Sequence, residues 1–210
     1  MVKFRPLNQD EISIRVQSIS EKRVNLLLYI DARTCENILD NAVGCMNWQR
    51  IHSRDNSNCT ISIWCEEKKM WVAKEDTGTR SNAEGDKGIA SDSFKRACVN
   101  WGIGRELFTA PMISLPVDFV NIIERNGSKS TYDKFSINYL TIEEKDSAKE
   151  ITALGISVNG NRVWAWEKGY DKPKFFYNNQ NPTTNQTEPP APINYQQNTK
   201  RASNWKSKTA

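Results

Sequence analysis

Few side chains in this sequence could carry nucleophilic or metal chemistry. His52 is the one histidine, so a serine or cysteine nucleophile would have a single imidazole as its base, and a histidine-rich metal site is excluded. The five cysteines contain no C-x-x-C pair, which argues against a structural zinc site. The sequence also lacks a G-x-x-x-x-G-K-[ST] phosphate loop, so we do not expect ATP-driven chemistry or a bound cofactor.

A loose match to metal-dependent nucleases is the one enzymatic alternative. Such enzymes use an Asp followed by Glu-x-Lys on a neighbouring strand, and Asp55 with Glu66-x-Lys68 has that order. Both halves fall in segments that resemble turns, where charged side chains are normally solvated. A second alternative is an oligomeric scaffold that binds no DNA, and the sequence leaves both open.

Basic side chains gather on a segment with the pattern of a helix, at about residues 86–101. Its apolar positions recur at spacings of four, three and four residues, and cations lie on another face. A basic track with aromatic rings nearby suits single-stranded nucleic acid, because cations contact phosphates and rings stack on bases of any sequence. The competing interpretation is an ordinary solvated helix. The candidate residues are Lys74, Arg80, Lys87, Lys95 and Arg96, with Trp64, Trp71 and Trp101 in neighbouring segments.

The formal net charge of +4 comes from the end of the chain. Residues 1–170 contain equal numbers of basic and acidic side chains, whereas residues 171–210 carry six basic and two acidic ones. The last 40 residues are also rich in Pro, Asn, Gln and Thr, a composition that is typical of disorder. We therefore expect a folded domain over residues 1–170 and a disordered tail over residues 171–210.

The folded part is expected to be α+β, with helices near its start. The first expected helix has a cap at Asn8 or Asp10 and an apolar stripe at Ile12, Val16 and Ile19. A second helix should begin at an Asp31 cap and stop at Gly44.

Antiparallel strands should make up most of the remainder. The expected strands are Trp48 to Ser53, Cys59 to Cys65 and Met70 to Lys74, followed by the helix at 86–101 and by Phe135 to Thr141, Ile151 to Val158 and Arg162 to Trp166. The middle strand of the first three alternates cleanly, so one of its faces should be buried. Asn159-Gly160 is a two-residue hairpin signal.

Cysteine usage and hydropathy bear on the compartment. The odd number of cysteines and the absence of a signal-like apolar run at the N-terminus favour a reduced chain. No segment approaches the roughly 20 apolar residues that span a bilayer. We expect a soluble cytoplasmic or nuclear protein without a membrane partner.

The block from Gly85 to Arg105, GDKGIASDSFKRACVNWGIGR, resembles phage members of the Rad-fifty-two superfamily of single-strand annealing proteins. The segment from Tyr29 to Arg33 with the following helix is similar to the N-terminal part of that family, and Cys59 to Gly78 is similar to its β-meander. The resemblance covers about residues 10–115, and its specific part is the 87–105 block.

The resemblance implies an antiparallel β-β-β-α core that assembles into a ring or helical oligomer and anneals complementary DNA strands in recombination and repair, without ATP. Single-stranded DNA would lie in a basic groove, in the cytoplasm of a bacterial host. By position, Lys95 and Arg96 match the Lys-Arg pair of the family, and Arg33 and Lys87 match further basic positions. Val99 stands where the eukaryotic protein has another arginine. The resemblance does not cover the tail. From its composition we expect the tail to recruit a partner, such as a single-strand-binding protein, or to make auxiliary DNA contacts, and the alternative is a tail that only aids solubility.

Overall fold

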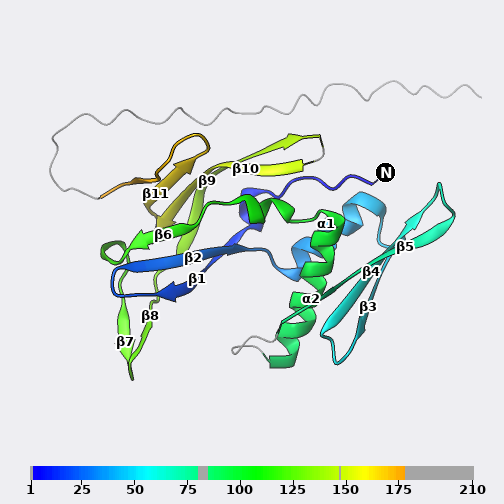
Figure 1. Cartoon of the computed structure of the whole chain (residues 1–210), viewed down its shortest axis with the longest axis horizontal. Coiled ribbons are helices and arrows are strands. Elements are labelled where there is room, and N and C mark those ends of the chain that lie inside the picture. Colours follow the sequence, from blue (N-terminus) through cyan, green and yellow to red (C-terminus); the bar gives the residue numbers. More distant parts are fainter. Residues whose placement is uncertain (1, 80–84, 147, 178–210) are drawn as a thin grey trace, which may run out of the picture. The chain divides into compact units, whose positions relative to one another are not determined.

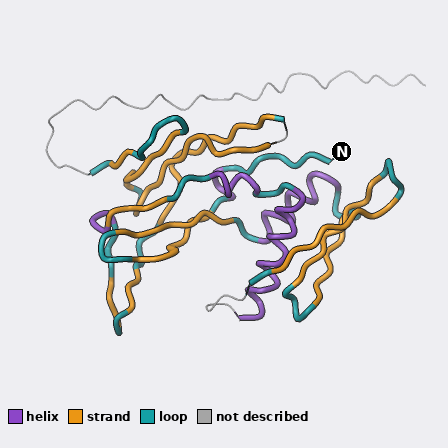
Figure 2. The backbone as a smooth tube through the Cα atoms, in the orientation of Figure 1, coloured by secondary structure: helices purple, strands orange, loops and turns teal. Residues whose placement is uncertain are grey.

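The computed structural model describes residues 2–79, 85–146 and 148–177, with only the backbone for residues 85–87. It has the expected α+β fold, built from helices and antiparallel sheets (Figure 1). Strand is the commonest regular structure along the described chain (Figure 2). Among the described residues, neither α-helix is long and apolar enough to cross a membrane.

The expected β-β-β-α core is confirmed. Strands β3 (Trp48–Ser53), β4 (Asn58–Cys65) and β5 (Met70–Thr77) form an antiparallel sheet, and helix α2 (Gly85–Trp101) packs on it. The buried face of β4 contains Cys59, Ile61 and Ile63, as its alternation predicts, while Cys65 is half-buried. Phe94 of α2 is fully buried against this face.

Helix α1 (Ala32–Val43) also follows the prediction. The side chain of Asp31 accepts a hydrogen bond from the backbone N–H of Thr34 at 2.7 Å, which satisfies a donor in the first turn of the helix. The helix ends at Gly44, whose φ of 83° lies in the left-handed region that favours glycine.

The helix expected around Ile12, Val16 and Ile19 is wrong. A short 3-10 turn, η1 (Gln9–Glu11), leads into strand β1 (Ser13–Ile19), which pairs with β2 (Arg23–Tyr29). Strand β6 (Ile113–Pro116) completes this sheet in the order β1-β2-β6. The register of β1 shifts between Val16 and Ser18, which marks a β-bulge. Because of the bulge, Val16 and Ile19 are both half-buried although they are three residues apart, a spacing that also places two residues on one face of a helix.

The C-terminal strands form a four-stranded sheet in the order β12-β11-β10-β9. Its members are β9 (Phe135–Lys145), β10 (Ala148–Val158), β11 (Asn161–Glu167) and β12 (Lys174–Phe175). Asn159 and Gly160 both have positive φ, at 50° and 83°, which confirms the expected hairpin turn. A small hairpin of β7 (Ile123–Arg125) and β8 (Ser128–Ser130) precedes this sheet.

The expected boundary at residue 170 falls inside the folded unit. Strand β12 pairs with β11, and the ring of Phe175 stacks on that of Phe119 at a centroid distance of 6.1 Å. These contacts give residues 174–177 apolar and backbone partners that composition alone does not reveal. The rest of the expected disordered tail, residues 178–210, lies outside the described residues.

A buried ion pair joins separate parts of the fold. Glu106, in the 3-10 turn η2 (Arg105–Thr109), is fully buried, and its Oε1 accepts a hydrogen bond from the backbone N–H of Leu7 at 2.8 Å. Its Oε2 lies 3.8 Å from Nζ of Lys149 in β10. That ammonium donates to the carbonyl oxygens of Arg5 and Gly102, both at 3.0 Å. The N-terminal segment, the end of α2 and β10 therefore meet at one charged contact.

Candidate nucleic-acid interface

Lys95 of α2 lies beside an aromatic ring on the first sheet. Its Nζ is 6.0 Å from the ring centroid of Tyr29 in β2, and the guanidinium carbon of Arg15 in β1 is also 6.0 Å from that centroid. Both distances are at the limit for a cation–π contact. We name Arg15, Tyr29, Asp31, Arg33 and Lys95 the Tyr29 cluster.

Strand pairing and a helix cap explain why this cluster forms. Ser13 pairs with Tyr29, so Arg15, two residues further along β1, lies on the same face of the sheet as the ring. The chain then passes from Tyr29 directly into the Asp31 cap of α1. The backbone N–H of Thr34 lowers the pKa of Asp31 most strongly, with smaller contributions from the charges of Arg33 and Lys95. The charges of the predicted residues Arg33 and Lys95 thus both act on the Asp31 carboxylate, and neither forms a salt bridge with it.

The cations of the Tyr29 cluster have few anionic partners among the described residues. Among the described residues, Arg15, Arg33 and Lys95 make no salt bridge, and Arg15 and Arg33 are exposed. Asp31 already accepts a hydrogen bond from its helix. The cluster therefore presents three positive charges against one carboxylate, next to a half-buried ring.

A second group of cations surrounds the C-terminal end of α2. Lys74 Nζ donates to the backbone carbonyl of Asn100 at 2.7 Å, and Arg105 Nη2 donates to the same oxygen at 3.2 Å. Arg96 Nε lies 3.3 Å from Asp76 Oδ1, and the amide of Asn100 donates to Asp76 Oδ2 at 3.2 Å. We name Lys74, Asp76, Arg96, Asn100 and Arg105 the Asn100 cluster.

The alternation of β5 positions the strand side chains of the Asn100 cluster. Lys74 pairs with the buried Ile61 and Asp76 with the buried Cys59, so both point to the side of the sheet that α2 covers. The ammonium of Lys74 also lies 4.5 Å from the centroid of Trp101. Lys74 is thereby engaged inside the protein, whereas the side chain of Arg96 remains 50% exposed.

The remaining predicted site residues can be placed only in part. Lys87 belongs to the backbone of α2, but its side chain lies outside the described residues, as does Arg80 entirely. Arg15 and Tyr29 were not predicted as neighbours of Lys95, because a helix was expected around Ile12, Val16 and Ile19. Arg105 was not predicted as a site residue either. A strand assignment for residues 13–19 would have indicated Arg15.

The three tryptophans near the basic segment have different surroundings. Trp64 and Trp71 form an edge-to-face pair with centroids 5.7 Å apart, at the turn end of β4 and β5 and on the face away from α2. Trp71 is 37% exposed. Trp101 packs against the core, and its indole N–H donates to the carbonyl of Ile61 at 3.1 Å. Trp101 is therefore a structural residue.

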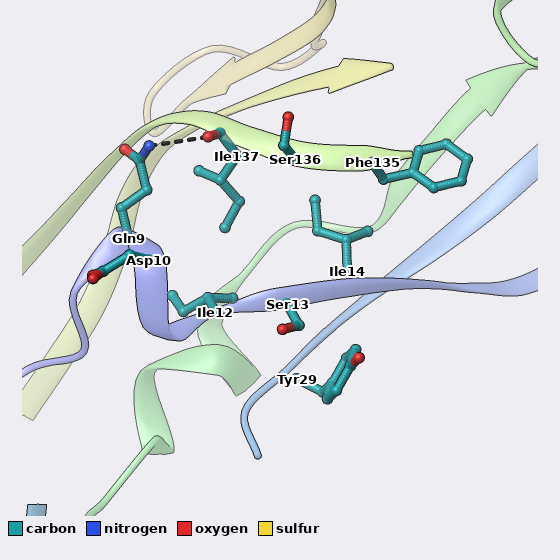
Figure 3. A pocket seen from close by; sticks show the side chains of 9 residues that line it. All are labelled: Gln9, Asp10, Ile12, Ser13, Ile14, Tyr29, Phe135, Ser136 and Ile137. Atoms are coloured by element: carbon teal, nitrogen blue, oxygen red, sulfur yellow. Dashed lines mark hydrogen bonds between the residues drawn. The ribbon is translucent and has the colours of Figure 1, made fainter. Parts of the chain in front are cut away.

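A groove of about 500 Å³ lies beside the Tyr29 cluster, between the start of β1 and the start of β9 (Figure 3). Tyr29 borders it, and the amide of Gln9 bridges it by donating to the carbonyl of Ile137 at 3.0 Å. Apolar and small polar side chains line the groove, and Asp10 is the charged one among them. The ring of Tyr29 thus contacts both this groove and the surface that carries Lys95 and Arg15.

The nuclease pattern is not assembled. Asp55 lies in the turn before β4 and Glu66 in the turn after it, so the eight residues of the strand separate them by roughly 25 Å. Glu66 accepts hydrogen bonds from the indole of Trp64 and from Lys69. Among the described residues, no three His, Cys, Asp or Glu side chains are grouped so that they could hold a metal ion.

The geometry fits reversible binding of a polyanion. Cations at Lys95, Arg15 and Arg33 can contact phosphates, and the half-buried ring of Tyr29 lies next to them as a surface on which a base can stack. No family model, curated protein or solved structure matches the chain.

Proposed function

We propose that this protein binds single-stranded DNA and anneals complementary strands without ATP, acting as an oligomer in recombination and repair. The observation that carries the proposal is the Tyr29 cluster, in which two cations flank one half-buried aromatic ring. The resemblance of the 87–105 block to the Rad-fifty-two superfamily supports the same function.

The cluster has the chemistry that sequence-independent binding needs. Cations near phosphates provide an affinity that is independent of base identity, and an aromatic ring can stack on any base. Annealing forms base pairs and makes or breaks no covalent bond, so it requires a surface that holds a strand and releases a duplex. In an oligomer, a small cluster on each subunit would repeat into a continuous track.

The test is an annealing assay with complementary oligonucleotides, without ATP, over a series of salt concentrations. We expect the wild-type protein to accelerate annealing, with an affinity for single strands that falls as salt rises. The double variant Lys95→Ala/Arg96→Ala should lose most of this activity. Its oligomeric state, measured by light scattering, should stay the same, because both side chains are outside the core.

A matched control removes the same charge elsewhere. Lys22 and Arg125 are exposed and form no salt bridge with a described residue, so Lys22→Ala/Arg125→Ala should anneal like the wild type. Normal annealing by the Lys95→Ala/Arg96→Ala variant would refute the assignment of these residues. Degradation of labelled strands with Mg²⁺ would instead indicate the nuclease, and an oligomer without salt-sensitive DNA binding would indicate the scaffold.

We also propose that the tail recruits a partner, such as a single-strand-binding protein. The folded unit extends to Tyr177, so the truncation should follow that residue. The truncated protein should anneal naked strands normally and strands coated with single-strand-binding protein less well. Equal activity on both substrates would remove this part of the proposal.

A further inference from the structure

Arg105 is a cation that the sequence analysis did not select, and its guanidinium is fixed at the end of α2. Its Nε and Nη2 donate to the carbonyl of Val99 at 3.2 and 2.8 Å, and Nη2 also reaches the carbonyl of Asn100 at 3.2 Å. The residue is exposed, and Nη1 makes no hydrogen bond to a described residue. One edge of the guanidinium is therefore held by the helix, while Nη1 remains unused.

Positive charge at this helix end exceeds the negative charge around it. Lys74 and Arg105 donate to the same carbonyl oxygen, so two full charges are held side by side. The C-terminal end of a helix offsets about half a charge. Neither cation has a carboxylate within 4.0 Å among the described residues, because Asp76 contacts Arg96 and the buried Glu106 faces Leu7 and Lys149. An anion that approaches this end is therefore attracted.

Position on the helix adds to this argument. The guanidinium of Arg105 lies on the carbonyl of Val99, which is three residues, or about one turn, beyond Arg96. Three residues of an α-helix rise about 4.5 Å, so the two guanidinium groups follow each other along the same helix. Arg96 and Arg105 could thus contact successive phosphates.

We propose that Arg105 binds a phosphate of the single strand and extends the track from Lys95 and Arg96 past the end of α2. The inference rests on the proposed function. The ligand group is a phosphodiester, which accepts hydrogen bonds from a planar guanidinium. Lys74 lies behind Arg105 and raises the local potential without touching the strand.

The experiment measures the affinity of the full chain for an oligothymidine strand at several salt concentrations, for the wild type, Arg105→Gln and Arg105→Lys. Loss of one phosphate contact should reduce the slope of log affinity against log salt by about 0.7, which corresponds to an about five-fold weaker affinity at 0.1 M salt. Arg105→Lys should keep the slope. Arg125→Gln, which changes an exposed arginine of the β7–β8 hairpin, is the matched control and should also keep it.

The outcomes separate the two proposals. A normal wild-type slope that Arg105→Gln leaves unchanged overturns this inference alone and makes Arg105 only a helix cap, even where the variant melts at a lower temperature. Absence of salt-dependent strand binding in the wild type overturns the proposed function and this inference together. A reduced slope in Arg105→Gln, with normal slopes in Arg105→Lys and Arg125→Gln, supports the inference.

Discussion

Lys95 and Lys74 carry the same charge on two elements that pack together, but their ammonium groups have different surroundings. The ammonium of Lys95 lies over the ring of Tyr29, and it makes no salt bridge with a described residue. Lys74 donates to a backbone carbonyl and lies over Trp101. A count of basic residues treats the two alike. Among the described residues, Lys95 has no carboxylate partner, whereas Lys74 joins β5 to α2 through its hydrogen bond to the carbonyl of Asn100.

The same contrast separates the two clusters as a whole. In the Tyr29 cluster, Arg15 and Lys95 lie at the ring, and the charges of Arg33 and Lys95 act on Asp31. In the Asn100 cluster, each cation has at least one hydrogen bond to the protein, and Arg96 and Arg105 keep further N–H groups for a ligand. The two clusters therefore carry similar charge but differ in how many hydrogen-bond donors the described protein atoms occupy.

The largest effect should come from Phe94, the residue that supports both clusters. Its side chain is fully buried and stacks with Trp48 at a centroid distance of 6.3 Å, and the Arg50 guanidinium lies 4.6 Å from its ring. Phe94→Ala should lower the free energy of unfolding by about 3–5 kcal/mol, measured by chemical denaturation. Phe108→Ala, at a phenylalanine that is 75% exposed, should change it by less than about 0.5 kcal/mol. Similar values for both variants would show that Phe94 does not hold α2.

A smaller effect should separate the ring from the charges in the Tyr29 cluster. Tyr29→Ala should weaken binding to an oligothymidine strand by about 1–3 kcal/mol, because it removes one stacking surface. The salt slope should stay unchanged, since no phosphate contact is lost. Tyr29→Phe is the control and should bind normally. Weak binding by Tyr29→Phe would mean that the hydroxyl group matters more than the ring.

The comparison of the two lysines can be tested directly. Lys74→Met should lower the free energy of unfolding by about 1–2 kcal/mol, because it removes a partly buried hydrogen bond and a cation–π contact. Lys95→Met should leave stability within about 0.5 kcal/mol of the wild type and reduce strand affinity about five-fold at 0.1 M salt. The reverse pattern, with Lys95 stabilising the fold and Lys74 binding DNA, would invert the assignment of the two lysines.

The smallest effect concerns pH. His52 in β3 lies 3.4 Å from the hydroxyl of Ser93 in α2, and burial, followed by the charge of Arg50, lowers the pKa of its imidazole. In the unfolded chain His52 binds a proton near pH 6.5, whereas in the folded chain it binds one only at lower pH. The free energy of unfolding should therefore fall as the pH drops from 7.5 to 5.5. His52→Gln should show a weaker pH dependence over this range. An identical dependence would show that His52 makes no contribution.

The sequence predicted the β-β-β-α core well because its signals are local. The alternation along β4 and the apolar spacing of α2 each depend on a single segment, and the Asp31 cap depends on four residues. The prediction for β1 was wrong for a physical reason. The bulge after Val16 lets Val16 and Ile19 both pack against the protein although they are three residues apart, and that spacing is also typical of a helix.

The clusters were harder to predict than the elements that carry them. Lys95 and Arg96 were visible as neighbours on a helix, but the face that Tyr29 and Arg15 share depends on the register of β1 and β2. Arg105 follows helix α2, and its guanidinium donates back to the carbonyl oxygens of Val99 and Asn100. Every residue has such a carbonyl, so the residue types around Arg105 do not indicate this contact. The Asp31 cap is also a contact to the backbone, but it follows a known residue preference, whereas the contact of Arg105 follows none.

The buried pair of Glu106 and Lys149 constrains how this sequence can evolve. Both side chains contact main-chain atoms of the N-terminal segment around Arg5 and Leu7, which we call the N-terminal arm. Substitutions of the side chains of this arm therefore leave the contacts to the pair in place. The two partners have no such freedom, because losing either one leaves the other charge buried and uncompensated. Exchange of both at once for apolar residues is the open route. Positions 106 and 149 should therefore co-vary across relatives, while the arm diverges around a fixed backbone.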